Sequence, residues 1–124
     1  MDSIGMMGFI PTRDAKMAKP FYAGVLGFRV LSEDDFALVL DSNGAKVRVT
    51  KVDDFTPQPF TILGWEVGDI DRVVSGLAGK GVQFERFGLK DQDPQGIWKS
   101  PSGARVAWFK DPDGNLLSLT QSPR

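Results

Sequence analysis

The chain has 124 residues, a formal net charge of −1, 41% hydrophobic residues and 25% charged residues. These values are ordinary for one soluble globular domain with a buried core, and the lack of a basic excess argues against a nucleic-acid partner. The sequence contains neither cysteine nor histidine, which excludes disulfides, thiolate metal ligands and a Ser-His-Asp triad.

The sequence of the first half of the chain predicts a strand, a helix and three further strands. A strand is predicted at residues 6–12 and a helix at 14–25, because Asp14 suits an N-cap and apolar residues then recur at three- and four-residue spacing. Gly27 supplies a stop signal for that helix. Strand-like runs follow at 28–31, 36–40 and 46–52.

The second half repeats this order of elements. A strand is predicted at residues 61–67, and a helix at 69–80 begins at Asp69 and ends before Gly81. Three strands follow at 82–87, 104–110 and 116–121. The repeated pattern predicts an α+β fold, in which two βαβββ repeats form one curved mixed sheet with the helices on its outer face.

The two halves also match in their turn residues. Asp41–Gly44 (Asp-Ser-Asn-Gly) and Asp111–Gly114 (Asp-Pro-Asp-Gly) each precede the last strand of a half. The interval from helix cap to turn is 27 residues in the first half and 42 in the second, so we place an insertion of about 15 residues at 88–103. We expect a single domain, 1–124, with repeat one at about 4–52, a linker at 53–60 and repeat two at about 61–121.

Three segments carry a resemblance to a known family. They are Asp14 with Phe21-Tyr22 and Val25-Leu26-Gly27-Phe28, then Trp65-Glu66-Val67-Gly68-Asp69-Ile70, and then Phe109-Lys110-Asp111-Pro112-Asp113-Gly114-Asn115. In this order and spacing the chain resembles the glyoxalase, bleomycin-resistance and dioxygenase superfamily, also called the vicinal oxygen chelate proteins. The resemblance implies the paired βαβββ fold, a cup-shaped site and a homodimer, because single-domain members usually pair to complete their sites.

Alternation along the strands predicts which side chains line the cup. A three-residue loop in the Asp-Pro-Asp-Gly turn sets Trp108 opposite Ser118, and the same logic sets Leu38 opposite Arg48 in the first half. The side chains expected to face the helices are Val47, Val49, Leu117 and Leu119. Those expected to face the cup are Arg48, Thr50, Ser118 and Thr120, with Leu38 and Trp108 beside them.

The resemblance also implies four metal-ligand positions, two at the starts of the first strands and two on the last strands. They fall at Met7, Ile62, Arg48 and Ser118. Metal-binding relatives typically carry His, Glu or Gln there, whereas a thioether, an alkyl chain, a guanidinium and a hydroxyl cannot replace them for a divalent ion. We therefore expect no metal and no other cofactor, which puts every metal-dependent activity of the superfamily in doubt.

The cup is expected to bind a small organic molecule instead. Its predicted lining is Met7, Phe9, Phe36, Leu38, Ile62, Trp108 and Ser118. Arg48 would either grip an anionic group of the ligand or pair with Glu66, because charges are seldom buried unless paired. Trp98, in the insertion, would close the cup as a lid or pack in the dimer interface.

Three functions remain open at this point. The first is a metal-free binding protein for an aromatic or amphipathic ligand with an anionic or polar group, with drug sequestration or resistance as the nearest analogy in the superfamily. The second is a glyoxalase-like lyase or isomerase, or a dioxygenase-related enzyme, with Glu66 as base and Arg48 stabilising an enolate. The third is a dimeric interaction module whose cup is filled by its own side chains.

The expected location is the cytoplasm. The first residues show no basic segment followed by an apolar run, so no secretory signal is predicted. No stretch approaches the roughly 20 apolar residues that span a bilayer. We therefore expect no membrane partner.

Overall fold

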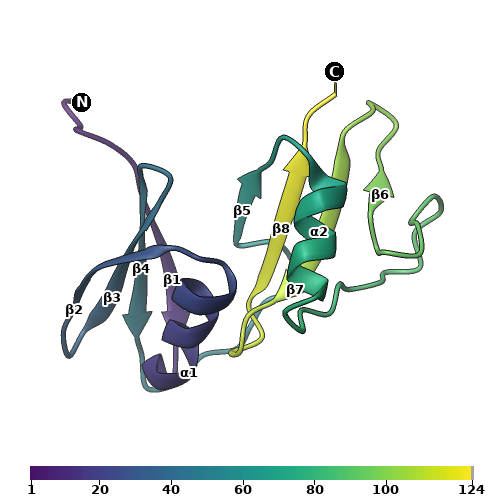
Figure 1. The fold of residues 1–124 in the computed structure, drawn as a ribbon. Coiled ribbons are helices and arrows are strands. Elements are labelled where there is room, and N and C mark those ends of the chain that lie inside the picture. Colours follow the sequence, from purple (N-terminus) through teal and green to yellow (C-terminus); the bar gives the residue numbers. More distant parts are fainter. Residues whose placement is uncertain (124) are drawn as a thin grey trace. The chain divides into compact units, whose positions relative to one another are not determined.

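The computed structural model describes residues 1–123, and these fall into two compact units, Met1–Pro57 and a second that begins at Gln58. Each unit contains one four-stranded mixed sheet and one helical segment (Figure 1). The predicted α+β class and the repeated order of strand, helix and three strands are confirmed. Within the described residues, neither helix combines the length and apolarity needed to cross a membrane.

The first unit is built on a sheet with the strand order β1-β4-β3-β2. Strand β1 runs parallel to β4, and the other neighbouring strands pair antiparallel. Its elements are β1 (Met7–Thr12), α1 (Ala15–Lys19), η1 (Pro20–Val25), β2 (Arg29–Glu33), β3 (Ala37–Ser42) and β4 (Ala45–Lys51).

The helix predicted at 14–25 consists of a short α-helix followed by a π-helical turn. The Asp14 carboxylate caps α1 by accepting a hydrogen bond of 3.0 Å from a backbone N–H two residues on. Pro20 lacks the N–H that the α-helix needs at this point, and the chain continues as η1, where the Leu26 N–H donates to the Phe21 carbonyl. The predicted helical span is therefore confirmed, and its second half is π-helical rather than α-helical.

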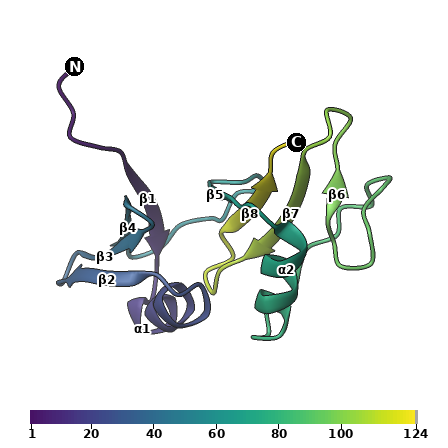
Figure 2. The same ribbon diagram turned by 45° about the horizontal axis from the view of Figure 1, so that its top comes forward.

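The helical segment covers one face of the first sheet (Figure 2). Alternate side chains of the strands form a core on that face and are at most 3% exposed: Ile10, Leu38, Leu40, Val47 and Val49. Ala18 and Tyr22 from the helical segment are fully buried. The intervening side chains of the strands lie on the opposite, helix-free face of the sheet.

The second unit is built on a sheet with the strand order β5-β8-β7-β6. Here β5 runs parallel to β8, and β6, β7 and β8 pair antiparallel. Its elements are β5 (Leu63–Glu66), α2 (Ile70–Ala78), β6 (Trp98–Lys99), β7 (Arg105–Lys110) and β8 (Leu116–Gln121).

Helix α2 covers one face of the second sheet, and its Ile70, Val74 and Leu77 are buried. The sheet contributes residues that are at most 4% exposed: Ala107, Phe109, Leu117 and Leu119. Trp65 is paired with Leu119 and lies on the same face. The second unit therefore repeats the arrangement of the first, with one covered and one helix-free sheet face.

The strand predicted at 82–87 is not formed. This segment pairs with β7 only through a bridge between Phe84 and Phe109. Further along, the same edge of β7 pairs with β6, because the inserted residues 88–103 fold back beside it. The prediction missed β6 because this insertion reads as a loop by its glycine, proline and aspartate content.

The two hairpins that position the site differ by one residue in register. In the second unit Trp108 lies opposite Ser118, as predicted. In the first unit Val39, rather than Leu38, lies opposite Arg48. The predicted register of that hairpin is therefore wrong by one residue, which exchanges the two faces of the strand.

The cause of the register difference is the length of the turn. Asn43 and Gly44 both have positive φ, 51° and 93°, and form a two-residue turn that directly joins the paired residues Ser42 and Ala45. Positive φ at both central residues is the mark of a type I′ hairpin turn. The second hairpin instead has the three-residue loop Pro112–Gly114, so the two turns match in composition but not in geometry.

Candidate functional site

The helix-free face of the first sheet places an arginine between two apolar side chains. Arg48, on the inner strand β4, lies beside Phe9 of β1 and Val39 of β3. Phe9 is 61% exposed, and Arg48 is half-buried. The face consists of Met7, Phe9, Pro11, Ala37, Val39, Asp41, Lys46, Arg48 and Thr50, and we call it the Arg48 face.

The Arg48 guanidinium has no ion-pair partner in its own unit. Among the described residues 1–57, no carboxylate oxygen lies within 4.0 Å of its nitrogen atoms. At longer range its charge acts on Asp34, whose pKa is lowered chiefly by the backbone N–H groups of Phe36 and Ala37 and to a smaller extent by Arg48. A half-buried cation in this position is suited to an anionic partner from outside the unit.

A second polar group on the Arg48 face also has unused hydrogen-bonding capacity. The Thr50 hydroxyl oxygen is buried and makes no hydrogen bond within the part of the chain that the structure describes. Thr50 lies two residues from Arg48 on the same face of β4. A buried hydroxyl without a partner is costly, but this oxygen exposes less than 1 Å², so a ligand on the Arg48 face would contact the Arg48 guanidinium rather than the Thr50 hydroxyl.

The predicted lining residues divide between this face and other places. Leu38 is fully buried on the helix-covered face, opposite Val49, so its assignment to the cup is corrected for the register reason given above. Phe36 precedes β3 and is 72% exposed, and Met7 lies on the Arg48 face at 41% exposed. Ile62 directly precedes β5 in the second unit and is half-buried.

The helix-free face of the second sheet carries a row of aromatic rings. The centroid of the Trp108 ring lies 5.3 Å from that of Phe87 and 6.0 Å from that of Trp98. Trp98 belongs to β6 and is hydrogen-bonded into the sheet edge, and its role as a lid or a dimer contact stays a prediction. The other residues of this face are Gly64, Glu66, Val106, Lys110, Leu116, Ser118 and Thr120.

Glu66, the predicted base, lies at the exposed end of β5. Its carboxylate accepts a hydrogen bond from the Ser122 hydroxyl. The two residues line a hollow of about 370 Å³ together with Val67, Gly68 and Gln121. The alternative pairing of Glu66 with Arg48 stays a prediction.

The four positions that the resemblance assigns to metal ligands do not fit a metal ion. Met7, Arg48, Ile62 and Ser118 offer one thioether and one hydroxyl as neutral donors, and a guanidinium that repels a cation. Within residues 1–123, no three His, Cys, Asp or Glu side chains are grouped closely enough to hold a metal. We therefore derive no chemistry through a metal at these positions.

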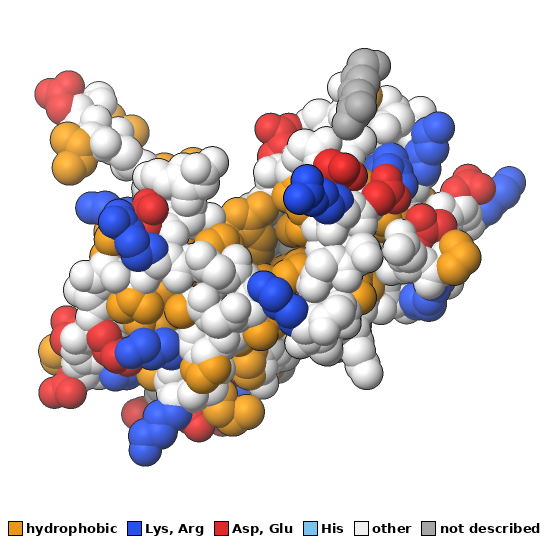
Figure 3. All heavy atoms as spheres, viewed as in Figure 1, with side chains coloured by type: hydrophobic (Ala, Val, Ile, Leu, Met, Phe, Trp, Pro, Cys, Tyr) orange, Lys and Arg blue, Asp and Glu red, His pale blue; other side chains and the backbone are white. Residues whose placement is uncertain are grey.

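Charged side chains of both signs are interspersed over the face of the molecule drawn in Figure 3. No broad patch of one sign is visible on that face. A polyanion such as nucleic acid would need such a basic patch. The charge that differs from its surroundings is instead that of the Arg48 guanidinium, which is half-buried between apolar side chains.

Comparison with known families finds one match over most of the chain. The family model described as Glyoxalase/Bleomycin resistance protein/Dioxygenase superfamily matches residues 3–119. No curated protein matches the chain.

Solved structures of similar fold include proteins of several descriptions. A member of the glyoxalase/bleomycin resistance protein/dioxygenase superfamily from Sphaerobacter thermophilus DSM 20745 is 24% identical, with a TM-score of 0.76 and 98% of both chains covered. TnmS3, an antibiotic binding protein from Streptomyces sp. CB03234, is 26% identical, with a TM-score of 0.72 and coverage of 98% of this chain and 97% of that one. Lactoylglutathione lyase from Agrobacterium tumefaciens is 15% identical, with a TM-score of 0.74 and coverage of 97% and 94%.

Proposed function

The chain belongs to the glyoxalase, bleomycin-resistance and dioxygenase superfamily, and we propose that its function is to bind a small organic molecule without a metal ion. The ligand is an aromatic or amphipathic molecule that carries an anionic group. Arg48 anchors that group, and Phe9 and Val39 contact the apolar part. The corresponding biological role is sequestration of a drug or another toxic compound.

The observation that carries this proposal is that Arg48 is half-buried and has no ion-pair partner among residues 1–57. Its guanidinium is half-buried between Phe9 and Val39, and no carboxylate among residues 1–57 pairs with it. A carboxylate or phosphate of a ligand would form short, charge-assisted hydrogen bonds to the guanidinium fork.

The similarity to TnmS3 supports a binding role. That protein is described as an antibiotic binding protein and shares 26% identity with this chain over almost its whole length. The residues at the superfamily's metal positions point the same way, because Met7, Arg48, Ile62 and Ser118 are unsuited to a divalent ion. A homodimer and a cytoplasmic location remain predictions.

The test is a binding measurement with two probes of nearly the same shape, one anionic and one neutral. Naphthalene-2-carboxylate and its neutral carboxamide are titrated into the wild-type protein and the Arg48→Gln variant by calorimetry. We expect Arg48→Gln to weaken carboxylate binding by about tenfold to a hundredfold, because a hydrogen bond to a charged group contributes about 1.5–3 kcal/mol. Carboxamide binding should change little.

The matched control is Lys46→Gln, which removes the same charge two residues away on the Arg48 face. A general electrostatic effect would weaken carboxylate binding in both variants alike, and that outcome would contradict the assignment of Arg48 as anchor. Equal carboxylate affinity of the wild type and Arg48→Gln would do so as well. Absence of binding to a broad panel of aromatic acids and antibiotics at about millimolar concentration would overturn the proposed function itself.

The enzymatic alternative, with Glu66 as base, has less support in the structure. Glu66 is exposed and already accepts a hydrogen bond from the Ser122 hydroxyl. Catalytic carboxylates that act as bases near neutral pH are usually tuned by burial or by a neighbouring like charge. We therefore place the binding function first.

A further inference from the structure

The inserted residues 88–103 surround a hollow of about 840 Å³ that the proposed function does not use. This volume is in the range of about 300–1,000 Å³ that small-molecule sites occupy. The lining residues are Leu89, Lys90, Asp91, Gln92, Asp93, Trp98, Lys99, Ser100 and Pro101. None of them belongs to the Arg48 face, and all of them belong to the second unit.

The walls of the hollow are held by hydrogen bonds that run back to the body of the second unit. The Gln92 amide nitrogen donates to the carbonyls of Glu85 and Gly96, both at 2.9 Å. Arg86 donates to the Asp93 carbonyl at 2.8 Å, and an Asp93 carboxylate oxygen accepts the backbone N–H groups of two following residues. The hollow is thus shaped before any ligand arrives, which lowers the entropy cost of binding.

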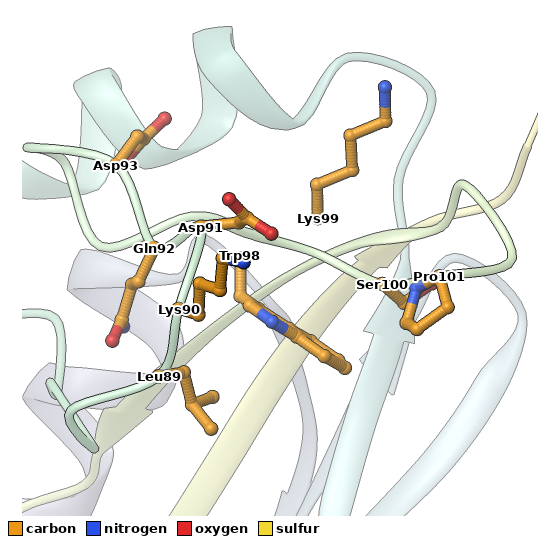
Figure 4. A pocket seen from close by; sticks show the side chains of 9 residues that line it. All are labelled: Leu89, Lys90, Asp91, Gln92, Asp93, Trp98, Lys99, Ser100 and Pro101. Carbon is orange, nitrogen blue, oxygen red and sulfur yellow. The ribbon is translucent and has the colours of Figure 1, made fainter.

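Trp98 provides the one flat apolar wall of the hollow. Its ring is packed on Trp108, 6.0 Å away between centroids, yet Trp108 does not line the hollow. The side of the indole turned away from Trp108 is therefore available to a ligand. Figure 4 shows the Trp98 ring across the middle of the hollow, with Leu89 on one side and Pro101 on the other.

The charges at the rim of the hollow cancel. The positive charges of Lys90 and Lys99 are balanced in number by the negative charges of Asp91 and Asp93. The Lys99 ammonium group points away from the Trp98 ring (Figure 4). The surface that the hollow offers is mainly apolar in spite of these residues. A ligand held here would be recognised by the shape and apolar surface of a ring rather than by its charge.

We propose that this hollow is a second binding site, which takes a planar aromatic group stacked on the free face of Trp98. It differs from the Arg48 face in chemistry, because the Arg48 face selects an anion and the balanced rim of the hollow does not select charge. Leu89 and Pro101 would contact the edges of the bound aromatic group. The two sites can be tested separately because they share no residue.

The test uses two probes of nearly the same shape. N-phenyl-1-naphthylamine is neutral, and 8-anilinonaphthalene-1-sulfonate adds one negative charge. We expect the neutral probe to bind with a rise in its fluorescence, and Trp98→Ala to weaken that binding about tenfold or more. Leu89→Ser, at a residue that is 39% exposed, should weaken it by a smaller factor without affecting folding. Leu31→Ser, at a residue of the first unit that is 41% exposed, is the matched control and should leave neutral-probe binding unchanged.

A second measurement covers the case in which Trp98→Ala fails to fold. The three tryptophans give three indole N–H signals in a ¹⁵N-correlated NMR spectrum of the wild-type protein, assigned by Trp→Phe variants. The Trp98 signal should shift in a saturable way with the neutral probe, while that of Trp65, on the helix-covered face, should not. An unmoved Trp98 signal at saturation, no binding of the neutral probe, or equal loss in Leu31→Ser would overturn the proposal. Loss of carboxylate binding at Arg48 would leave it standing.

Discussion

Gly64 lies on β5 directly beside Ser118 of β8. A Cβ atom at position 64 would lie 2.6 Å from the Ser118 hydroxyl oxygen and 3.2 Å from its carbonyl oxygen. At the corresponding place in the first unit, the neighbours are Phe9 and Arg48. The two repeats thus share a backbone register but carry side chains of different size at this place. The missing side chain of Gly64 makes room for Ser118, a residue that is only 8% exposed.

Gly64→Ala is expected to lower the free energy of unfolding by about 1–3 kcal/mol, because overfilling a packed site forces neighbouring atoms apart. Urea denaturation followed by circular dichroism measures it. Adding Ser118→Ala should relieve part of the loss, since the hydroxyl contact disappears while the carbonyl contact stays. Gly76→Ala in α2 is the control, because an added Cβ meets open space there and alanine favours the helix. An unchanged stability of Gly64→Ala would show that β5 shifts freely.

Prediction of which side chains face the site depends on single residues in the turns. The pairing of Trp108 with Ser118 followed from the sequence because the Asp-Pro-Asp-Gly segment specifies its loop. Leu38 was misplaced because a two-residue Asn-Gly turn shifts the strand by one position. The unused hydrogen-bonding capacity of Thr50 could not be predicted, since it depends on distances between atoms that no pattern of residues contains.

At the scale of elements, the helices show what local rules can and cannot predict. Both caps, Asp14 and Asp69, were predicted from residue type and position, and both side chains accept a backbone N–H. The π-helical turn that begins at Pro20 follows from its missing N–H, so the predicted helical span holds but only its first part is α-helical. The strand β6 has only two residues, and so short a strand forms through pairing with β7 rather than through its own propensity.

An ion pair joins two elements of the second unit. Arg105 at the start of β7 donates two hydrogen bonds to the Asp71 carboxylate in the first turn of α2, at 2.6 and 2.8 Å. These bonds lower the pKa of Asp71 below its ordinary value of 3.8. The Asp71 side chain is 54% exposed, so solvent screening limits the contribution of the pair to about 0.5–1 kcal/mol.

Asp71→Asn is therefore expected to destabilise the protein by about 0.5–1 kcal/mol at pH 7. Because the folded pKa is lowered, the stabilisation is complete above the unfolded value of 3.8 and is lost as the pH falls through the lower folded value. The difference between wild type and variant should shrink over that acidic range in urea titrations. Asp53→Asn, at an exposed carboxylate in the first unit, is the control. A difference that does not change with pH would show that the charge of Asp71 is not responsible.

At the scale of the whole chain, duplication made the fold predictable. Two helix caps, two glycine stops and two similar turns at matching intervals predicted two βαβββ repeats, and the structure has them. The insertion at 88–103 was the part without a counterpart in the first half, and there the prediction missed both β6 and the hollow. In a duplicated chain, each element can be predicted from the sequence of either copy. The insertion has no second copy, and its own composition resembles that of any loop.

The residues at the four metal positions lead to the remaining prediction, which concerns the whole molecule. We expect purified protein to contain no stoichiometric metal by elemental analysis, and its Tm to be the same with chelator as with submillimolar Zn²⁺, Ni²⁺ or Mn²⁺. The physical reason is that Met7, Arg48, Ile62 and Ser118 supply no anionic or imidazole ligand. A metal bound by the native state at 100 times its Kd would stabilise the protein by about 2.7 kcal/mol, which corresponds to a Tm shift of several degrees.

Such a shift, or one equivalent of metal after purification, would show that other side chains bind an ion and would remove the reason for a metal-free function. If neither is found, carboxylate binding at Arg48 should persist undiminished in the presence of chelator, because the guanidinium holds the anion without a metal.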